Sequence, residues 1–342
     1  MTSRYRRVAL LGGAGFLGRH LAQRLTREPN APEVRVADAR RERPPELAPA
    51  VEFIGGCDAT DPAQVHVAIR ECDAVVNLIG LISYWRRDAG RLATINAGAA
   101  ATIARACVAL GVGRLVHVSS SAALGFRDDA ARPIDETFEF DWTHPLAKPY
   151  MVSKRDGEAA IALAEREGVS TAVANPAAMY GPGDTVNTAR LFVAVRRGAV
   201  RVVPPGGNAL ADVRDVARGL QLLLDSPHRA QRFLFVGHNL SFLDIITAVG
   251  RAVGRPAAPR VLPAWSRRPL CGGLRLVERF LPREGMVAPD DLEMGFVYRY
   301  ASARKAAELL GWTPQYAFAD TARDQARDLH ARGLLEGAAA VA

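Results

Sequence analysis

The chain has 342 residues, of which 49% are hydrophobic and 23% are charged. This balance predicts a globular protein with a large core and excludes disordered and fibrous proteins. The net charge is +8, but no nucleic-acid-binding motif and no internal repeat accompanies the basic residues, so we expect no nucleic-acid partner.

Targeting and redox signals are weak. Arg4, Arg6 and Arg7 precede an apolar run, as in a secretory signal, but no small-residue cleavage site follows, so we expect no targeting segment. No apolar stretch reaches the roughly 18 residues that a membrane span needs. The four cysteines form no CxxC pair and no metal-ligand spacing. We therefore expect a cytoplasmic protein with reduced, packed cysteines and no metal site.

The first predicted elements are a strand, a glycine-rich loop and a helix. Residues 8–11 are continuously apolar, as in a buried parallel strand, and apolar residues then recur from Phe16 with helical spacing. Gly12 permits a sharp turn, Gly15 lets backbone approach a pyrophosphate, and Gly18 lets the helix pack on the strand. A glycine-rich turn of any α/β protein is the alternative, because three glycines alone are a weak signal.

Asp38 strengthens the dinucleotide interpretation. It ends the next predicted strand, residues 34–38, twenty residues after Gly18, where an acid accepts hydrogen bonds from an adenosine ribose. A carboxylate there would repel a 2′-phosphate, so we predict NAD rather than NADP as the cofactor. Arg40 and Arg41 follow closely and could bind that phosphate, which keeps NADP as the alternative.

Strands and helices continue to alternate along the first half of the chain. We predict a strand over 51–55, a helix over about 62–70 and a strand over 74–78. This alternation predicts an α/β fold with a doubly wound parallel sheet of the Rossmann type. Asp58 follows the first of these strands, where it would either meet the adenine or cap a turn. The segment 96–110 has Arg105 as its one charge, so we expect a helix with neighbours on both sides.

Chemistry-bearing side chains follow the next predicted strand, at 115–118, which ends in three serines, residues 119–121. Ligands of open α/β sheets bind at the carboxyl ends of strands, although serines there also cap or turn the chain. Pro149 suits the first turn of a helix, which places Tyr150 and Lys154 four residues apart on one face. An ammonium beside the phenol would lower the tyrosine pKa from about 10 and ease proton transfer. We therefore interpret the serines, Tyr150 and Lys154 as a catalytic group rather than a chance surface pattern.

These motifs resemble the extended short-chain dehydrogenase/reductases of the NAD-dependent epimerase/dehydratase superfamily. The resemblance covers nearly the whole chain and rests on segments 12–18, 96–98, 119–122, 150–154 and 175–184, with Asp38 and Asp58. It implies that Ser121 holds the substrate oxygen, that Tyr150 is the acid and base, and that Lys154 binds ribose and tunes Tyr150. It also implies that Asn96 supports the active site. The cofactor-binding residues expected from it are Gly12, Gly15, Phe16, Leu17, Gly18, Asp38, Asp58, Asn77, Tyr150, Lys154 and Pro176.

Departures from the family pattern indicate which branch of the family the chain resembles. Leu124 precedes Gly125 where sugar-nucleotide epimerases often have tyrosine, and Asn175 stands where they often have arginine. Both features resemble the dihydroflavonol-reductase and 3β-hydroxysteroid-dehydrogenase branch. Asn77 begins a segment that differs from the family's usual two alanines.

The resemblance implies an enzyme that transfers hydride between a nicotinamide cofactor and a secondary alcohol or ketone as its small-molecule substrate. A sugar-nucleotide epimerase or dehydratase, which oxidises and re-reduces its substrate on one cofactor, is the alternative. A non-catalytic cofactor-binding scaffold is a third interpretation, against which the Tyr150 and Lys154 pair argues. The family pattern also implies a homodimer formed through the helices that contain residues 97–110 and 151–165.

The second half of the chain is expected to select the substrate. We divide the sequence into a dinucleotide-binding domain over 1–180 and a smaller, interleaved C-terminal lobe over 181–342. Asp215 is predicted to cap a helix, and a short helix is predicted from Ser302 to a closing glycine, Gly311.

A basic segment lies within this lobe. Residues 251–283 contain eight arginines and a single acid, Glu278. Apolar residues recur there at the spacing of one helix face, with aromatic residues nearby: Leu270, Leu274, Val277 and Leu281, with Trp265 and Phe280. One interpretation is ordinary core over the substrate cleft, with arginines that are solvated or meet an anionic substrate. The other is an amphipathic flap, over 265–281, that contacts an anionic membrane and admits a lipid-like substrate.

Overall fold

The computed structural model describes residues 4–27, 30–277, 280 and 288–335. Its main sheet consists of seven strands: β1 (Arg7–Leu11), β2 (Glu33–Asp38), β3 (Glu52–Gly55), β4 (Ala74–Asn77), β5 (Arg114–Val118), β6 (Ser170–Pro176) and β10 (Gln231–Phe235). All pair in parallel, in the order β10-β6-β5-β4-β1-β2-β3. The order reverses between β1 and β4, which confirms the predicted doubly wound α/β sheet of the Rossmann type.

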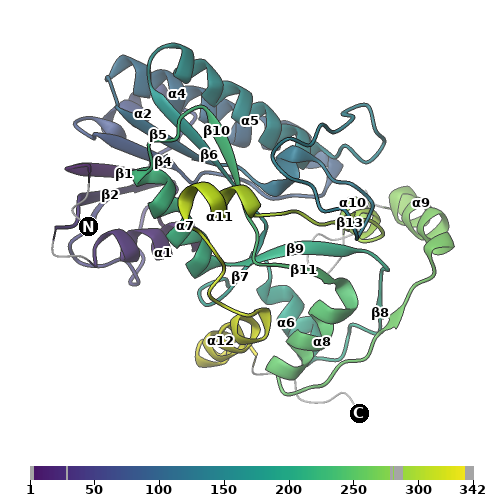
Figure 1. The fold of residues 1–342 in the computed structure, drawn as a ribbon. Coiled ribbons are helices and arrows are strands. Elements are labelled where there is room, and N and C mark those ends of the chain that lie inside the picture. The colour runs from purple at the N-terminus through teal and green to yellow at the C-terminus, as the bar shows by residue number, and fades with distance from the viewer. Residues whose placement is uncertain (1–3, 28–29, 278–279, 281–287, 336–342) are drawn as a thin grey trace.

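Helices cover both faces of this sheet (Figure 1). One face carries α1 (Phe16–Leu25), α7 (Val213–Asp225) and α11 (Arg304–Leu310). The other carries α2 (Pro62–Ile69), α4 (Ala99–Ala109) and α5 (Pro149–Arg166). The central strands are therefore buried on both faces, which is why they read as continuous apolar runs in the sequence.

A continuous helical run from Arg86 to Ala109 joins η1 (Arg86–Asp88), α3 (Ala89–Leu92), η2 (Ala93–Gly98) and α4. Among the described residues it is the one helix that, by its 24 residues and composition, would be long and apolar enough to cross a membrane. This corrects the expectation that the sequence contains no such segment. The run packs between α2 and α5, and Leu92, Ile103 and Cys107 are fully buried. The buried part of the run, 44% of its most apolar window, belongs to the core of the protein.

The smaller lobe has a mixed sheet of β7 (Ala178–Tyr180), β9 (Gly207–Asp212), β11 (His238–Ser241) and β13 (Tyr298–Arg299). Around it lie α6 (Ala189–Arg196), α8 (Phe242–Ala252) and α12 (Phe318–Ala331), and β8 (Val202–Val203) pairs with β12 (Arg260–Val261). Phe192 and Phe318 lie in its core. Between β9 and β11 the chain returns to the main sheet through α7 and β10. Residues after 180 therefore belong to both lobes, as the predicted interleaving of the two requires.

The start of α7 corrects one sequence prediction. The N-cap is Asp212 rather than Asp215, because Asp212 Oδ1 accepts a 2.8 Å hydrogen bond from the backbone N–H of Arg214. Asp215 lies in the first turn, and its Oδ2 accepts hydrogen bonds from the backbone N–H groups of Gln315 and Tyr316. Asp215 therefore fastens the C-terminal segment to α7.

Trp312 anchors the same segment to the main sheet. α11 ends as predicted at Gly311, whose φ of +62° favours glycine. Its N-cap is Ala303, and Oγ of Ser302, the predicted cap, accepts a 3.3 Å hydrogen bond from the backbone N–H of Arg304. Trp312 follows Gly311 and is fully buried, with its ring 5.2 Å from that of Phe235. Its Nε1 donates a 2.8 Å hydrogen bond to the carbonyl of Asp215.

Trp312→Ala should lower the free energy of unfolding by about 3–5 kcal/mol, because it removes a buried ring and the donor to a buried carbonyl. Trp265→Ala makes the same change at a side chain that is 77% exposed. It should change the free energy of unfolding by less than about 0.5 kcal/mol. Urea unfolding followed by circular dichroism measures both, and equal losses in the two variants would contradict the assigned packing.

Candidate active site

The glycine loop forms a cradle that side chains would fill. Gly12 has a φ of +77°, and a Cβ there would lie 3.0 Å from Ile79 Cγ1. A Cβ on Gly18 would lie 2.5 Å from the backbone of Gly13, so glycine is needed for α1 to pack this closely on the loop. α1 follows Gly15, which has no side chain to cap it, so its first N–H groups are available to an anion. The cradle therefore fits the pyrophosphate of a dinucleotide.

Asp38 stands at the end of β2 beside this cradle. Its Oδ2 accepts a 3.1 Å hydrogen bond from the backbone N–H of Ala14, and its Oδ1 accepts one of 3.0 Å from the backbone N–H of Arg40. These bonds hold the carboxylate at the edge of the sheet, the position from which an acid accepts hydrogen bonds from ribose hydroxyls.

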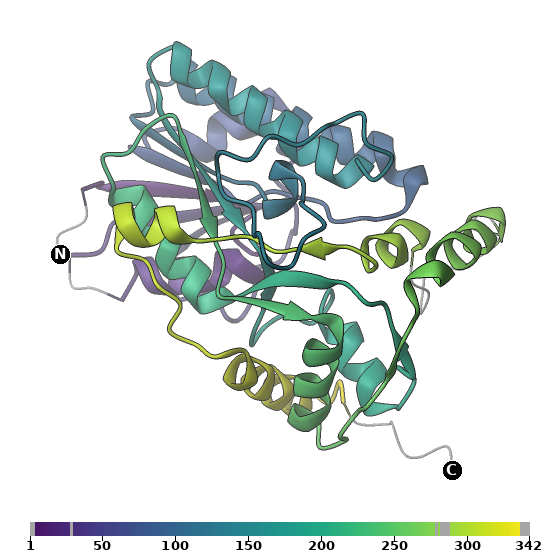
Figure 2. The same cartoon turned by 45° about the vertical axis from the view of Figure 1, so that its right-hand side comes forward.

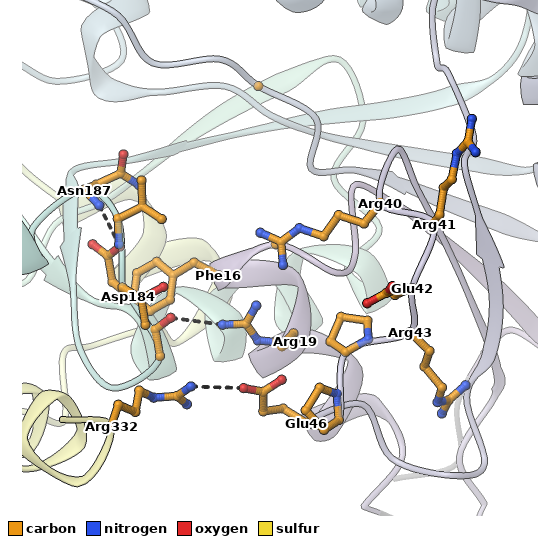
Figure 3. A pocket seen from close by; sticks show the side chains of 17 residues that line it. Phe16, Arg19, Arg40, Arg41, Glu42, Arg43, Glu46, Asp184, Asn187 and Arg332 are labelled. Atoms are coloured by element: carbon orange, nitrogen blue, oxygen red, sulfur yellow. Dashed lines mark hydrogen bonds and ion pairs between the residues drawn. The ribbon is translucent and has the colours of Figure 1, made fainter. Parts of the chain in front are cut away.

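A cleft of about 770 Å³ opens beside α1 and the segment after β2 (Figure 3). Basic side chains outnumber acidic ones on its walls: Arg19, Arg40, Arg41, Arg43 and Arg332 against Glu42, Glu46 and Asp184. Figure 3 shows the guanidinium of Arg40 directed toward Phe16, whereas Arg41 points away from it. The cleft suits an anionic ligand. Arg40 and Arg41 were considered for binding a 2′-phosphate, and of these two Arg40 is the one whose side chain points toward Phe16 (Figure 3).

The segment after β7 closes one wall of the cleft against α1. Arg19 donates hydrogen bonds of 2.9 Å to the carbonyl of Ala14 and 3.0 Å to that of Gly183. His20 Nε2 lies 2.8 Å from the carbonyl of Pro182. The glycine loop and the start of the smaller lobe are thus joined through one turn of α1.

The other residues predicted to bind the cofactor lie in different surroundings. Phe16 lines the cleft. Leu17 is buried on the core side of α1, and Pro176 is buried at the end of β6. Their contacts with the cofactor stay predictions.

The side chains of Asn77 and Asp58 are used within the protein. Asn77 Oδ1 accepts a 3.0 Å hydrogen bond from the backbone N–H of Ile79, and its Nδ2 lies 3.0 Å from His117 Nδ1. Asp58 Oδ1 accepts a 2.9 Å hydrogen bond from the backbone N–H of Thr60, which is the turn-capping role weighed for it. Asn77 thus fixes the turn after β4, and Asp58 fixes the turn before α2.

Tyr150 lies on the buried face of α5, whose first residue is Pro149 as predicted. Its hydroxyl lies close to the side chain of Ser120, and its ring lies 5.7 Å from that of Tyr84. Burial raises the pKa of Tyr150 above its ordinary value, Tyr84 raises it further, and the side chain of Ser120 opposes both. This direction is opposite to the lowering expected from Lys154. In these surroundings Tyr150 keeps its proton at neutral pH.

Ser120 is therefore the serine that contacts Tyr150. Its Oγ also accepts a 3.2 Å hydrogen bond from the backbone N–H of Ala122, which caps η3 (Ser121–Leu124). Ser121, the residue predicted to hold the substrate oxygen, is the first residue of η3, and its role stays a prediction. The sequence contains no signal that separates the two serines, because both directly follow the same strand.

Lys154 is buried between β5 and the segment after β4. Its Nζ donates a 3.3 Å hydrogen bond to the carbonyl of Val118, and a Cβ on Gly80 would lie 2.7 Å from Nζ. Burial lowers the pKa of Lys154 to about 8, and the carboxylate of Glu158 opposes this shift. Gly80 therefore belongs to the site, although the sequence did not predict it. A glycine is needed there because a Cβ would occupy the space of the Lys154 ammonium, and this contact is visible only in the fold.

Glu158 is a second residue that the sequence reading missed. Its Oε1 accepts a 2.6 Å hydrogen bond from Asn175 Nδ2. Burial raises the pKa of Glu158. The sequence did contain a signal for Glu158. Tyr150, Lys154 and Glu158 follow one another at intervals of four residues, which places all three on one face of the helix.

Asn96 lies in the π-helical turn η2 and connects two parts of the site. Its Oδ1 accepts a 2.7 Å hydrogen bond from the backbone N–H of Leu81. Its Nδ2 donates to the carbonyl of Leu81 at 3.0 Å and to Ser153 Oγ at 2.8 Å. These bonds hold the segment after β4 against α5, and the supporting role of Asn96 in the active site stays a prediction.

Polar side chains of the smaller lobe complete the surroundings of Tyr150. Burial raises the pKa of Tyr84, and the nearby guanidinium of Arg299 in β13 opposes this shift. Asp291 belongs to α10 (Pro289–Met294), where burial raises its pKa and the nearby guanidinium of Arg299 opposes the shift. Neither residue belongs to a local motif, so only the fold shows that both lie near Tyr84.

A doubly wound sheet with a glycine cradle, an acid at the end of β2 and a tyrosine–lysine pair on α5 defines a dinucleotide-dependent enzyme. The model of the NAD dependent epimerase/dehydratase family matches residues 8–236, and the chain belongs to this family. The enzyme therefore uses NAD and has an oxidoreductase or epimerase activity.

Two curated relatives are reductases by description. A putative dihydroflavonol 4-reductase from Synechocystis sp. is 26% identical over 307 residues, which cover 88% of each chain. A ceramide reductase from Caulobacter vibrioides is 30% identical over 224 residues, 64% of this chain and 61% of that protein.

Solved structures confirm the fold. The UDP-glucose 4-epimerase of Thermotoga maritima gives a TM-score of 0.75 at 19% identity and covers 95% of this chain and 99% of its own. The enzyme WbmG of Bordetella bronchiseptica, solved in complex with NAD, gives 0.73 at 20% identity, with 97% and 96% covered.

We expect NADH to bind less tightly as the pH rises above 8. Lys154, whose pKa is about 8 in this structure, then loses its proton and can no longer make charge-assisted hydrogen bonds to ribose. The affinity should fall by about tenfold between pH 7 and pH 9.5, since a hydrogen bond to a charged group contributes about 1.5–3 kcal/mol. NADH fluorescence titration across this range measures the effect.

Lys154→Met is the control for that titration. It should bind NADH weakly, with an affinity that does not change over the same pH range. A wild-type affinity that stayed constant from pH 7 to pH 9.5 would contradict the assignment of Lys154.

Proposed function

We propose that the protein is an NAD-dependent oxidoreductase that transfers hydride between the nicotinamide and a secondary alcohol or ketone by a serine–tyrosine–lysine mechanism. One observation carries the proposal. The phenol of Tyr150, beside Ser120, and the buried ammonium of Lys154 lie on one face of α5 at the carboxyl end of β5. That end of the sheet is where ligands of this fold bind.

The cofactor supplies the hydride when it is bound. Tyr150 gives its proton to the substrate oxygen or takes it back, and the serine hydroxyl orients that oxygen. Lys154 binds the ribose with its ammonium. Because its surroundings keep the phenol of Tyr150 protonated at neutral pH, it has the proton that the substrate oxygen takes up when a ketone is reduced.

A sugar-nucleotide epimerase or dehydratase is the second candidate, supported by the structural likeness to UDP-glucose 4-epimerase. Asn175 argues against it, because it gives Glu158 a neutral partner where epimerases of this family often have arginine. Retention of NAD through dialysis discriminates the candidates. Tight retention favours the epimerase, exchange with turnover of ketones favours the dehydrogenase, and exchange without turnover of any carbonyl favours a scaffold.

We also propose a cytoplasmic homodimer that pairs through α4 and α5. Small residues lie on the outer faces of these helices, with Gly98 before α4 and Ala159 and Ala162 on α5 exposed beside Leu163. Small side chains allow helices of two copies to approach closely. The four cysteines are free and buried, as packed thiols of a reducing compartment would be.

Tyr150→Phe should lower turnover of a ketone identified by NADH absorbance in a substrate panel by about 10²–10⁴, the range of general acid–base groups. NADH affinity should stay within about twofold of the wild type, because the hydroxyl is assigned to proton transfer. Ser120→Ala should lower turnover more than Ser121→Ala, because Ser120 contacts the phenol. Retained turnover in Tyr150→Phe would refute the mechanism. A larger loss of turnover in Ser121→Ala than in Ser120→Ala would indicate that Ser121 holds the substrate oxygen.

A further inference from the structure

Helix α9 (Arg267–Val277) turns an apolar face to the solvent. It follows η4 (Ala264–Ser266) and projects at the edge of the molecule in both views (Figures 1 and 2). Leu276 is 80% exposed, Trp265 77% and Phe280 76%. Among the described residues these are the three most exposed large hydrophobic side chains, and all belong to this segment.

The orientation of α9 differs from the predicted stripe. Leu270 and Val277 are exposed, and Leu281 lies outside the described residues, as do Glu278 and Arg279. The residue of α9 that is buried is Cys271. The stripe therefore does not form core over the cleft, and the apolar positions opposite Cys271 face outward.

Two acids of α10 hold the arginine side of α9 against the protein. Arg275 pairs with Glu293 and, at 3.4 Å, with Asp290, and Arg267 lies 3.8 Å from Glu293. The same two acids bind Lys148, the N-cap of α5, at 3.2 and 2.5 Å. Asp290 and Lys148 are almost fully buried. This network fixes the apolar face of α9 outward and joins α9 to the start of the catalytic helix.

The chain from the end of α8 through α9 is strongly basic. Residues 251–277 contain six arginines and no acid. Five of these arginines are exposed: Arg251 and Arg255, at and after the end of α8, and Arg260, Arg268 and Arg275, in β12 and α9. An apolar helix face that carries an aromatic residue beside it and is flanked by arginines matches the interface of a bilayer with anionic headgroups.

We propose that α9, together with Trp265 and Phe280, docks in the headgroup region of an anionic membrane. The apolar side chains enter the boundary with the acyl chains, and the exposed arginines bind lipid phosphates. A second copy of the chain fits this face less well, because it would place two sets of arginines without acids against each other. A bilayer supplies both the apolar region and the negative charge.

Co-sedimentation with vesicles tests the proposal without any substrate, so its outcome is independent of the proposed catalysis. The vesicles contain phosphatidylcholine with or without phosphatidylglycerol. Wild type should bind the anionic vesicles at least about tenfold more tightly than the neutral ones at low salt, and high salt should reduce this difference.

Three double variants separate the contributions. Trp265→Ser with Leu276→Ser should weaken binding to anionic vesicles by at least about tenfold. Arg260→Glu with Arg268→Glu should remove the preference for anionic vesicles. Val67→Ser with Leu309→Ser is the control, because these side chains are 48% and 45% exposed on α2 and α11. It should bind as wild type does, and circular dichroism should show all three variants folded.

Absence of wild-type binding to anionic vesicles at low salt would overturn the proposal, as would wild-type binding by the Trp265 and Leu276 variant. A wild-type dimer that this variant converts to monomer, without vesicle binding, would identify the face as a contact between copies and would also overturn it.

Discussion

The buried ammonium of Lys154 is the constraint around which this active site is built. It lies between the carbonyl of Val118 and Gly80, so β5, the segment after β4 and α5 have to meet at one point. Asn96 holds that segment in place from the π-helical turn. Glu158 offsets part of the cost of burying the charge. The position of Tyr150 follows, because it precedes Lys154 by one turn of the same helix.

A second charged network extends this arrangement to the surface. Lys148 is the N-cap of α5, and the acids that bind it also bind Arg275 of α9. The helix that carries Tyr150 is thereby connected to the most exposed apolar face of the described structure. Burial of an ion pair is costly unless several partners share the charge, and here two acids serve several basic side chains. The same interactions that order the start of α5 therefore decide which face of α9 meets the solvent.

Local signals predicted the fold and the order of its elements. Periodicity and glycine spacing located the strands, the cradle and the helix that starts at Pro149, because these depend on short stretches of chain. Contacts between distant segments were not predictable in this way. Asp215 was assigned as a cap because the bonds to Gln315 and Tyr316 lie a hundred residues away. The proximity of Tyr150 to Ser120 depends likewise on tertiary packing, because three adjacent serines do not show which of them lies near the phenol. The spacing of the leucines in α9 predicts an apolar face, but it does not show that this face is turned to the solvent.

Transfer of deuterium from the cofactor tests the central claim most directly. NADH labelled with deuterium at the transferring position of the nicotinamide is incubated with the protein and a panel of cyclic and acyclic ketones, and the alcohols are analysed by mass spectrometry. We predict that deuterium appears on the carbinol carbon of one product as an equal amount of NADH is consumed, and that Tyr150→Phe slows the transfer by about 10²–10⁴. Interconversion of sugar-nucleotide stereoisomers without net consumption of NADH, together with no labelled alcohol, would contradict this account.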